Sequence, residues 1–330
     1  MHAHDKIIIL LWLSITALLI VSVFFGSVFL SPGQIIAGLF GQGSGSENLI
    51  VQEIRLPRGL AALLAGACLG GAGAALQGLL RNPLADPGVL GVSSSAALGA
   101  VVVIYFNIAA IGFWVVPSAT IIFAVGATFL LAMIGAASIS PTRLILIGVG
   151  LSAFAGSLIS LAMTMSPNPF ALADLINWLF GTVANRSFRD LTITVPVAIA
   201  GFICVAVIAR DIRALTLGDE TAITLGVDMQ RLRLLAIIGT SLLVGASVSI
   251  AGAIGFVGII APHLMRPLVG HDPAKLIWPS ALLGGALLLM ADMIIRILPF
   301  DQELRLGVVA ALIGAPGFVW VAISSRREIA

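Results

Sequence analysis

The sequence predicts an all-α membrane protein, a polytopic helical bundle of about ten spans in a single transmembrane domain, residues 1–330. Three observations predict this class. Only 10% of the residues are charged and 59% are hydrophobic, whereas a soluble domain is about 25% charged. The apolar runs have the length of membrane-spanning helices, about 20 residues. They also lack the alternating pattern of β-barrel strands, which excludes that architecture.

Ten apolar runs are long enough, or nearly so, to cross a bilayer. The first is too long for the apolar region of a signal peptide and lacks a small-residue cleavage site, so it is interpreted as an uncleaved span. The eighth is the weakest, because Pro262 and His263 interrupt it. The predicted spans are 7–30, 59–80, 89–110, 112–137, 143–165, 191–209, 234–253, 255–269, 276–298 and 306–323.

The positions of Lys and Arg predict that both termini face the cytoplasm. In that orientation the cytoplasmic segments hold eleven of the 17 basic residues, and such an excess is the usual sign of the inner side. The polar octapeptide RNPLADPG, residues 81–88, is then cytoplasmic. The basic residues are too scattered to predict a nucleic-acid partner. Six arginines fall on the outer side, where the rule disfavours them: Arg55, Arg58, Arg186, Arg189, Arg296 and Arg305.

An internal repeat is visible in the second and seventh spans. LLAGACLGGAGA (63–74) matches LLVGASVSIAGA (242–253) at seven of twelve positions. Because the two segments are five spans apart, the repeat is predicted to be inverted in the membrane, with spans 2–5 equivalent to spans 7–10. The small residues also allow close helix packing, which is the simpler role for each individual glycine.

The chain lacks the residues of an enzyme or a self-powered carrier. It has no GxxxxGK[ST] phosphate loop and no metal-binding motif, and Cys68 and Cys204 are interpreted as small membrane-embedded side chains. Asp292 is the one carboxylate inside an apolar run, and Arg296 follows it at the i+4 position of an internal ion pair. Ion-coupled carriers usually keep unpaired acidic residues near midplane, so the sequence predicts a pathway without its own motor.

A candidate attachment point for a motor lies in the longest cytoplasmic segment, about 210–233. Gly218, Asp219 and Glu220 are predicted to open a short helix, because acidic residues suit a helix N-terminus. Gly226 is predicted to end it, and Asp228 to cap the seventh span. This segment is either a solvated, self-capped loop or a rigid knob that docks into another protein.

Four segments resemble the FecCD family, the membrane subunits of type II ABC importers for vitamin B12, ferric siderophores and haem. They occur in the family's order and span nearly the whole chain. The resemblance implies a second copy of the chain, two cytoplasmic ATP-binding subunits, and an extracytoplasmic substrate-binding protein. ATP would be used by the partner subunit, with no cofactor bound covalently to this chain and no metal site. The segments are RLPRGLAALLAGACLGGAGAALQGLLRNPLADPGVLGVSSSAALGA (55–100), LGDETAITLGV (217–227), AGAIGFVGIIAPHLMR (251–266) and LGVVAALIGAPGFVW (306–320).

The resemblance also implies roles for individual positions. The cytoplasmic gate would be formed by the loops after spans 2 and 4, here Asn82, Pro83, Leu84, Ser140, Pro141 and Thr142. Coupling to the ATPase would fall on Gly218, Asp219, Glu220, Thr221, Ala222, Leu225 and Gly226. Docking of the binding protein would fall on Arg55, Arg58 and Arg296, since guanidinium groups bind carboxylates bidentately.

The cargo implied by the resemblance is haem, because NPLADPGVLGVSSSAALGA is more similar to haem importers than to most siderophore permeases. Arg186 and Arg189 are candidate contacts for its propionates near the outer mouth, with binding-protein docking or lipid headgroup contact as alternative roles. A ferric siderophore or vitamin B12 is an alternative cargo. From other classes, a carrier or channel without an ATPase and a membrane scaffold remain competing interpretations. The expected location is the bacterial cytoplasmic membrane, and the second subunit is either an identical or a related chain.

Overall fold

The computed structural model describes residues 3–135, 141–298 and 303–324, and ten apolar helices form its body. Six are long and apolar enough to span a membrane by length and composition alone, and three more are shorter apolar helices of 10–17 residues. The ten are α1 (Ala3–Phe24), α4 (Leu56–Leu80), α5 (Val92–Tyr105), α6 (Val115–Gly135), α7 (Pro141–Thr164), α9 (Phe188–Val207), α12 (Met229–Ala251), α13 (Val257–Met265), α14 (Pro273–Ile297) and α15 (Leu306–Ser324).

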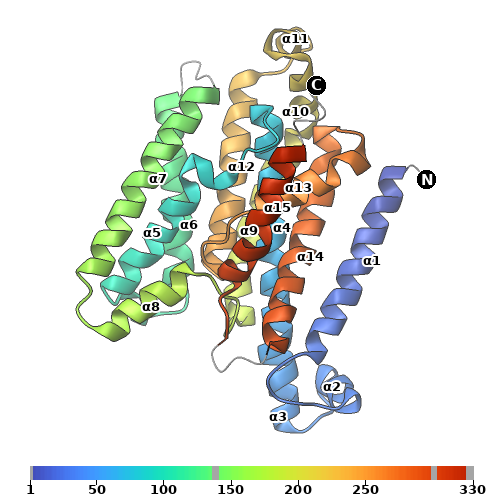
Figure 1. Ribbon diagram of the computed structural model, residues 1–330, viewed down its shortest axis with the longest axis vertical. Helices are drawn as coiled ribbons and strands as arrows, with labels where there is room; N and C mark the ends of the chain where they lie inside the picture. Colours follow the sequence, from blue (N-terminus) through green and yellow to red (C-terminus); the bar gives the residue numbers. More distant parts are fainter. Residues whose placement is uncertain (1–2, 136–140, 299–302, 325–330) are drawn as a thin grey trace.

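These ten helices correspond one to one with the ten predicted spans, and the bundle confirms the predicted fold class. Figure 1 shows the N-terminal end of α1 and the C-terminal end of α15 at the same end of the molecule, as an even number of spans requires. The main differences in length are in α1, which stops at Phe24 rather than Leu30, and in α5, which is only 14 residues long.

Short helices lie at both ends of the bundle. The end that carries the termini also carries α10 and α11, and the opposite end carries α2, α3 and α8 (Figure 1). The helix α8 was not predicted; Asn168 caps it by accepting a hydrogen bond from Ala171 N, and Pro169 occupies its first turn. The short helices are α2 (Pro32–Leu39), α3 (Gly45–Asn48), η1 (Leu49–Arg55), η2 (Pro87–Leu90), η3 (Ile108–Ile111), α8 (Pro169–Leu179), α10 (Ala209–Ala214), η4 (Leu215–Leu217), α11 (Asp219–Thr224) and η5 (Pro267–Val269).

The centre of the bundle is α4, which packs on α14, α12 and α13. Its glycines make this possible, because their backbones touch neighbouring backbones directly. A Cβ at Gly66 or Gly70 would overlap the carbonyl oxygen of Gly284 or Ser280 in α14, and one at Gly73 would overlap that of Gly258. Close approach of small residues is the main packing device of membrane helices, since lipid provides no hydrophobic drive for their association.

The packing follows the predicted internal repeat. Gly66 of α4 and Gly245 of α12 occupy equivalent positions in the two matching segments. Gly66 lies against α14, the ninth span, and Gly245 lies against Ala124 of α6, the fourth span. Spans 2 and 7 therefore each pack on the third helix of the other repeat, which is the exchange that two interlocked repeats produce.

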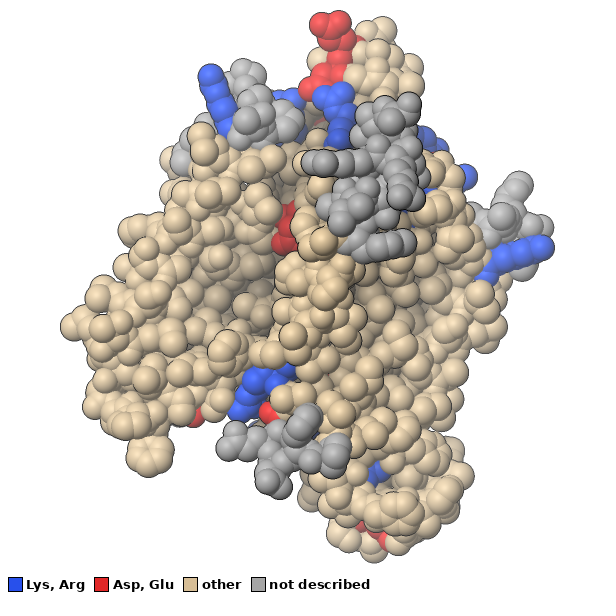
Figure 2. All heavy atoms as spheres, in the orientation of Figure 1, with Lys and Arg blue, Asp and Glu red and all other residues tan. Residues whose placement is uncertain are grey.

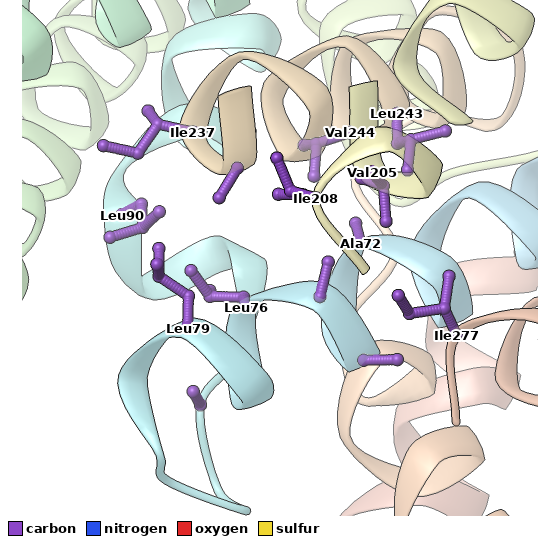
Figure 3. Packing of buried hydrophobic residues seen from close by; sticks show 14 of the residues in the cluster. Ala72, Leu76, Leu79, Leu90, Val205, Ile208, Ile237, Leu243, Val244 and Ile277 are labelled. Atoms are coloured by element: carbon purple, nitrogen blue, oxygen red, sulfur yellow. The ribbon is translucent and has the colours of Figure 1, made fainter. Parts of the chain in front are cut away.

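Below the cytoplasmic end of the bundle, one apolar cluster joins helices that are distant in sequence. Figure 3 shows Leu76 and Leu79 of α4, Ile208 before α10 and Ile237 of α12 around a common space, with Leu90 of η2 beside them. All five side chains are buried. The loop after α4 and the base of the α10–α11 segment are therefore held by the same core.

Candidate functional site

The loop of residues 81–91, called the gate loop after its predicted role, connects α4 to α5 at the cytoplasmic end. The helix α4 ends at Arg81, which adopts a left-handed conformation with φ +49°. Asn82 then accepts a hydrogen bond from Leu84 N at 2.9 Å, and Asp86 accepts one from Gly88 N at 2.7 Å and caps η2. Each turn of the loop is thus fixed by a side chain of the octapeptide itself.

The predicted gate residues of this loop are at its surface. Asn82, Pro83 and Leu84 are exposed, while Ala85 and Leu90 on either side of Asp86 are buried. A short exposed tip with buried anchors is a suitable geometry for a closing element. Of the second predicted gate segment, Ser140 lies outside the described residues, and only the backbone of Pro141 and Thr142 is described, at the start of α7.

Gln77 and Arg266 fasten the gate loop to the bundle. The Gln77 side chain donates to the carbonyl oxygens of Ala85 and Gly258, each at 3.4 Å, and accepts a hydrogen bond from Arg266. Sequence reasoning did not single out either residue. Burial raises the pKa of the Asp86 carboxyl in the same loop, although the hydrogen bond from Gly88 N acts in the opposite direction.

The predicted coupling segment forms the outermost feature of the cytoplasmic end (Figure 1). The helix α11 begins at Asp219 after Gly218 and ends at Thr224, and Gly226 has the positive φ, +89°, expected of a terminating glycine. Asp228 caps α12 by accepting hydrogen bonds from Gln230 N and Arg231 N, each at 3.0 Å. The local structure predicted for this segment is therefore confirmed.

The coupling segment forms a knob with an apolar base. Ala222, on the inner face of α11, is fully buried. Glu220, Thr221 and Leu225 are exposed to the solvent. Ile212 of α10 packs directly on Gly78 of α4, where a Cβ would overlap the Ile212 side chain. The knob thus has a buried base on α4 and presents an exposed face.

The three arginines predicted to dock a binding protein are engaged inside the chain. Arg55 is 4% exposed and donates to the carbonyl oxygens of Val23, Phe24 and Val28. Arg296 is also nearly buried and donates to Ser22 O at 3.0 Å. Both guanidinium groups therefore cap the C-terminal end of α1, where the helix dipole favours positive charge.

Arg58 and Arg296 also share the carboxylate of Asp292, which is 1% exposed. Arg58 Nε lies 2.8 Å from Asp292 Oδ1, and Arg296 Nε lies 2.8 Å from Asp292 Oδ2. This confirms the predicted i+4 pair and adds Arg58 from α4 to it. Arg58 bonds Glu303 as well, and Glu303 is 38% exposed. Of the three predicted docking residues, Arg58 has the most exposed side chain, at 14%.

Arg186 and Arg189 lie at the outer end, around the start of α9. Arg189 is exposed, with its guanidinium carbon 6.0 Å from the centre of the Phe113 ring. The Nε of Arg186 is buried and makes no hydrogen bond to any described residue. Burial lowers the pKa of the Arg186 guanidinium, and the nearby charge of Asp190 opposes that shift. Arg186 thus keeps one buried donor without a partner among the described residues, whereas the guanidinium group of Arg189 lies near the Phe113 ring.

Arg305, which was predicted on the outer side without a role, lies beside the loop that precedes α9. Leu306 N and Gly307 N donate to the carbonyl oxygens of Gly181 and Phe180. Arg305 Nη2 lies 2.7 Å from Asn177 Oδ1, and the neighbouring Trp178 Nε1 is buried without a partner among the described residues. Unpaired buried donors are costly, so they mark this loop as a polar site within an apolar protein.

One face of the molecule connects the two ends of this candidate pathway. Figure 2 shows a hollow between the half that contains α5 to α8 and the half that contains α14 and α15. Acidic atoms are visible within its upper part and basic atoms at its lower, outer end, while its walls are otherwise formed by uncharged residues. The hollow therefore leads from the charged outer end toward the cytoplasmic end.

Comparisons with known proteins agree with this architecture. The model of the FecCD transport family matches residues 13–324. The vitamin B12 import system permease protein BtuC of Klebsiella pneumoniae is 34% identical over 93% of this chain and 90% of its own length. The Fe(3+)-citrate import system permease protein YfmE of Bacillus subtilis is 35% identical over 97% and 96%.

A solved structure is similar over the whole fold. It is described as an inward-facing conformation of a metal-chelate type ABC transporter, and it is 32% identical to this chain. The match covers 97% of this chain and 99% of the other, with a TM-score of 0.87. Family, fold and membrane-spanning helices thus agree, and the chain belongs to the FecCD transport family as a polytopic permease of the bacterial cytoplasmic membrane.

Proposed function

We propose that this chain forms the translocation pathway of an ATP-driven importer for haem, with a ferric siderophore or vitamin B12 as the alternative cargo. Its relatives are named as permeases for vitamin B12 and Fe(3+)-citrate, so an organic metal complex is the common cargo class. The chain would work with a second copy of itself, two ATP-binding subunits and an extracytoplasmic substrate-binding protein.

The observation that carries the transport proposal is the joint placement of an exposed loop tip and an exposed knob at the cytoplasmic end. Asn82–Leu84 would close the pathway, together with Ser140–Thr142 of each copy. The exposed face of α11 would enter the ATPase subunit, because Leu225 at the end of this helix is 62% exposed.

At the outer end, Arg58 is the best placed of the proposed docking residues. Its present partner Glu303 is exposed, so a carboxylate from a binding protein would replace Glu303 without entering the core. For Arg55 and Arg296, docking requires that the guanidinium groups leave the end of α1. We therefore expect Arg58 to contribute most to docking and Arg55 least.

The support for haem is the unpaired donor of Arg186 in the outer loop, with Arg189 exposed nearby in sequence. Two basic groups at a pathway entrance suit a cargo with two carboxylates, since charge-assisted hydrogen bonds are the strongest polar contacts available to them. Vitamin B12 has no such carboxylates, so the two arginines favour haem over vitamin B12, while a ferric siderophore with carboxylates would suit them as well.

The test is uptake into liposomes that contain the complete transporter. Haem, ferric citrate and vitamin B12 are each supplied with ATP, and uptake is compared between the wild-type chain and the Arg186→Ala, Arg189→Ala double variant. The proposal predicts haem uptake that falls in the double variant. If only vitamin B12 is taken up, haem is not the cargo. If haem uptake is unchanged in the double variant, Arg186 and Arg189 do not contact the cargo.

A further inference from the structure

An ion pair joins the gate loop directly to the coupling knob. Arg81, the first residue of the loop, places Nη2 2.6 Å from Asp219 Oδ1, and Asp219 is the first residue of α11. The two residues are 138 positions apart in sequence. Asp219 also receives Arg233 of α12 on its other oxygen, at 3.3 Å. One carboxylate thus joins the cytoplasmic ends of α4 and α12, the two equivalent helices of the repeat.

The backbone at Arg81 is set up for this contact at a cost. Arg81 ends α4 in the left-handed region, φ +49° and ψ +34°, where glycine is the favoured residue. Arg81, with its long side chain, thus occupies a position at which the end of a helix would favour glycine. An unfavourable backbone conformation of this kind points to a role for the side chain.

Stability does not explain the pair. Arg81 and Asp219 are 43% and 38% exposed, and exposed ion pairs contribute little to the free energy of folding. The base of the knob is already held by the apolar contact of Ile212 with Gly78. The pair therefore connects the gate loop to the knob without being needed for folding.

We propose that the Arg81–Asp219 pair is the link through which movement of the coupling knob reaches the gate loop. This inference rests on the proposed roles of α11 and of Asn82–Leu84. When the ATPase displaces α11, Asp219 moves with the helix and the ion pair displaces Arg81. Because Asn82 follows Arg81 in the chain, the gate tip moves as well. Arg81 is a positioning residue in this account: it contacts no cargo and sets where the gate tip lies.

The test measures cargo imported per ATP hydrolysed by the complete transporter in liposomes. Arg81→Gln and Asp219→Asn are each expected to lower that ratio roughly five-fold, the lower end of coupling between distant sites. The Arg81→Gln, Asp219→Asn double variant is expected to be no worse than either single variant, because both changes break the same link. Arg81→Lys, which keeps the charge, should restore part of the ratio.

The matched control is Asp272→Asn, which keeps a side-chain oxygen to cap α14. Asp272 pairs with Arg213 at 3.0 Å, and that pair is also partly exposed, but it joins α10 to α14 and includes no residue of the gate loop. It should leave the ratio unchanged. The link is refuted if the Arg81→Gln variant imports as much cargo per ATP as wild type. It is also refuted if the fold-losses of the two single variants multiply in the double variant. A wild-type complex without ATP-dependent transport would instead refute the proposed function.

Discussion

Two glycine-containing membrane helices of similar length, α4 and α7, have opposite environments. Most residues of α4 are buried, whereas in α7 the buried residues among those described are Leu144, Gly148 and Ala155. A Cβ at Gly73 of α4 would overlap a backbone carbonyl oxygen, whereas nothing lies within 4 Å of a Cβ at Gly150 or Gly156 of α7. Glycine is thus a packing requirement at Gly73 of α4, whereas at Gly150 and Gly156 of α7 the single chain leaves it unconstrained.

The comparison separates a rigid centre from a peripheral helix. α7 touches the rest of the chain mainly through α5 and through Gly148, which packs on Val89 and Leu90 of η2. Its remaining apolar surface includes Leu146 and Phe154, which are 71% and 63% exposed in the single chain. A helix fixed at its gate-loop end and open elsewhere is the natural surface for lipid or for the proposed second copy.

The largest expected effect is in the rigid centre. Asp292→Asn leaves Arg58 and Arg296 without their shared buried charge, and breaking a buried pair typically costs about 3–5 kcal/mol. The free energy of unfolding in detergent should fall accordingly. The matched control is Asp174→Asn on α8, where the carboxylate is exposed and no described partner is recorded; a change there is expected to stay within about 0.5 kcal/mol. Equal losses of stability in Asp292→Asn and Asp174→Asn would contradict the contrast between the buried centre and the exposed periphery.

A smaller but still clear loss is expected from Gly73→Ala. The new methyl group overlaps Gly258 O, so α13 must shift, and overpacking of this kind costs about 1–3 kcal/mol. The midpoint of thermal unfolding should fall. A variant as stable as wild type would show that α4 and α13 are not in direct contact.

Gly156→Ala in α7 is expected to increase the free energy of unfolding. Since nothing opposes the methyl group, the change removes only the conformational cost of glycine and should stabilise the helix by about 0.5–1 kcal/mol. Thermal unfolding and the mass of the detergent-solubilised assembly should be recorded together. A stability loss with dissociation of a dimer would instead place Gly156 in the contact between two copies.

The smallest expected effect concerns pH and the gate loop. Burial raises the pKa of Asp86, so the folded chain binds this proton more readily than the unfolded chain. Stability from this group is therefore present at low pH and lost as the pH rises through the raised pKa. Asp86→Asn, which keeps an acceptor for Gly88 N, should unfold at a slightly higher temperature than wild type at neutral pH. The difference should vanish in acid, and a difference that grows in acid would contradict this assignment.

The sequence was sufficient for the spans and for the local turns, because both depend on neighbouring residues. Apolar length predicted the helices, and Gly218, Gly226 and Asp228 predicted the boundaries of α11 and α12. The partners of Arg55 and Arg296 were not predictable, since each guanidinium caps α1 across a long stretch of chain. The same holds for Arg81 and Asp219: both were recognised within their own segments, but their contact depends on how α4 and α10 pack.

The most direct test of the account is whether transport depends on an ATPase. Purified chain is placed in liposomes alone, with the ATP-binding subunits, and with those subunits plus the binding protein, and haem uptake is followed with and without ATP. We expect uptake only in the complete assembly and only with ATP, because the proposed roles of this chain are a pathway, a gate and a contact for a separate ATPase. Haem uptake by the chain alone would contradict it.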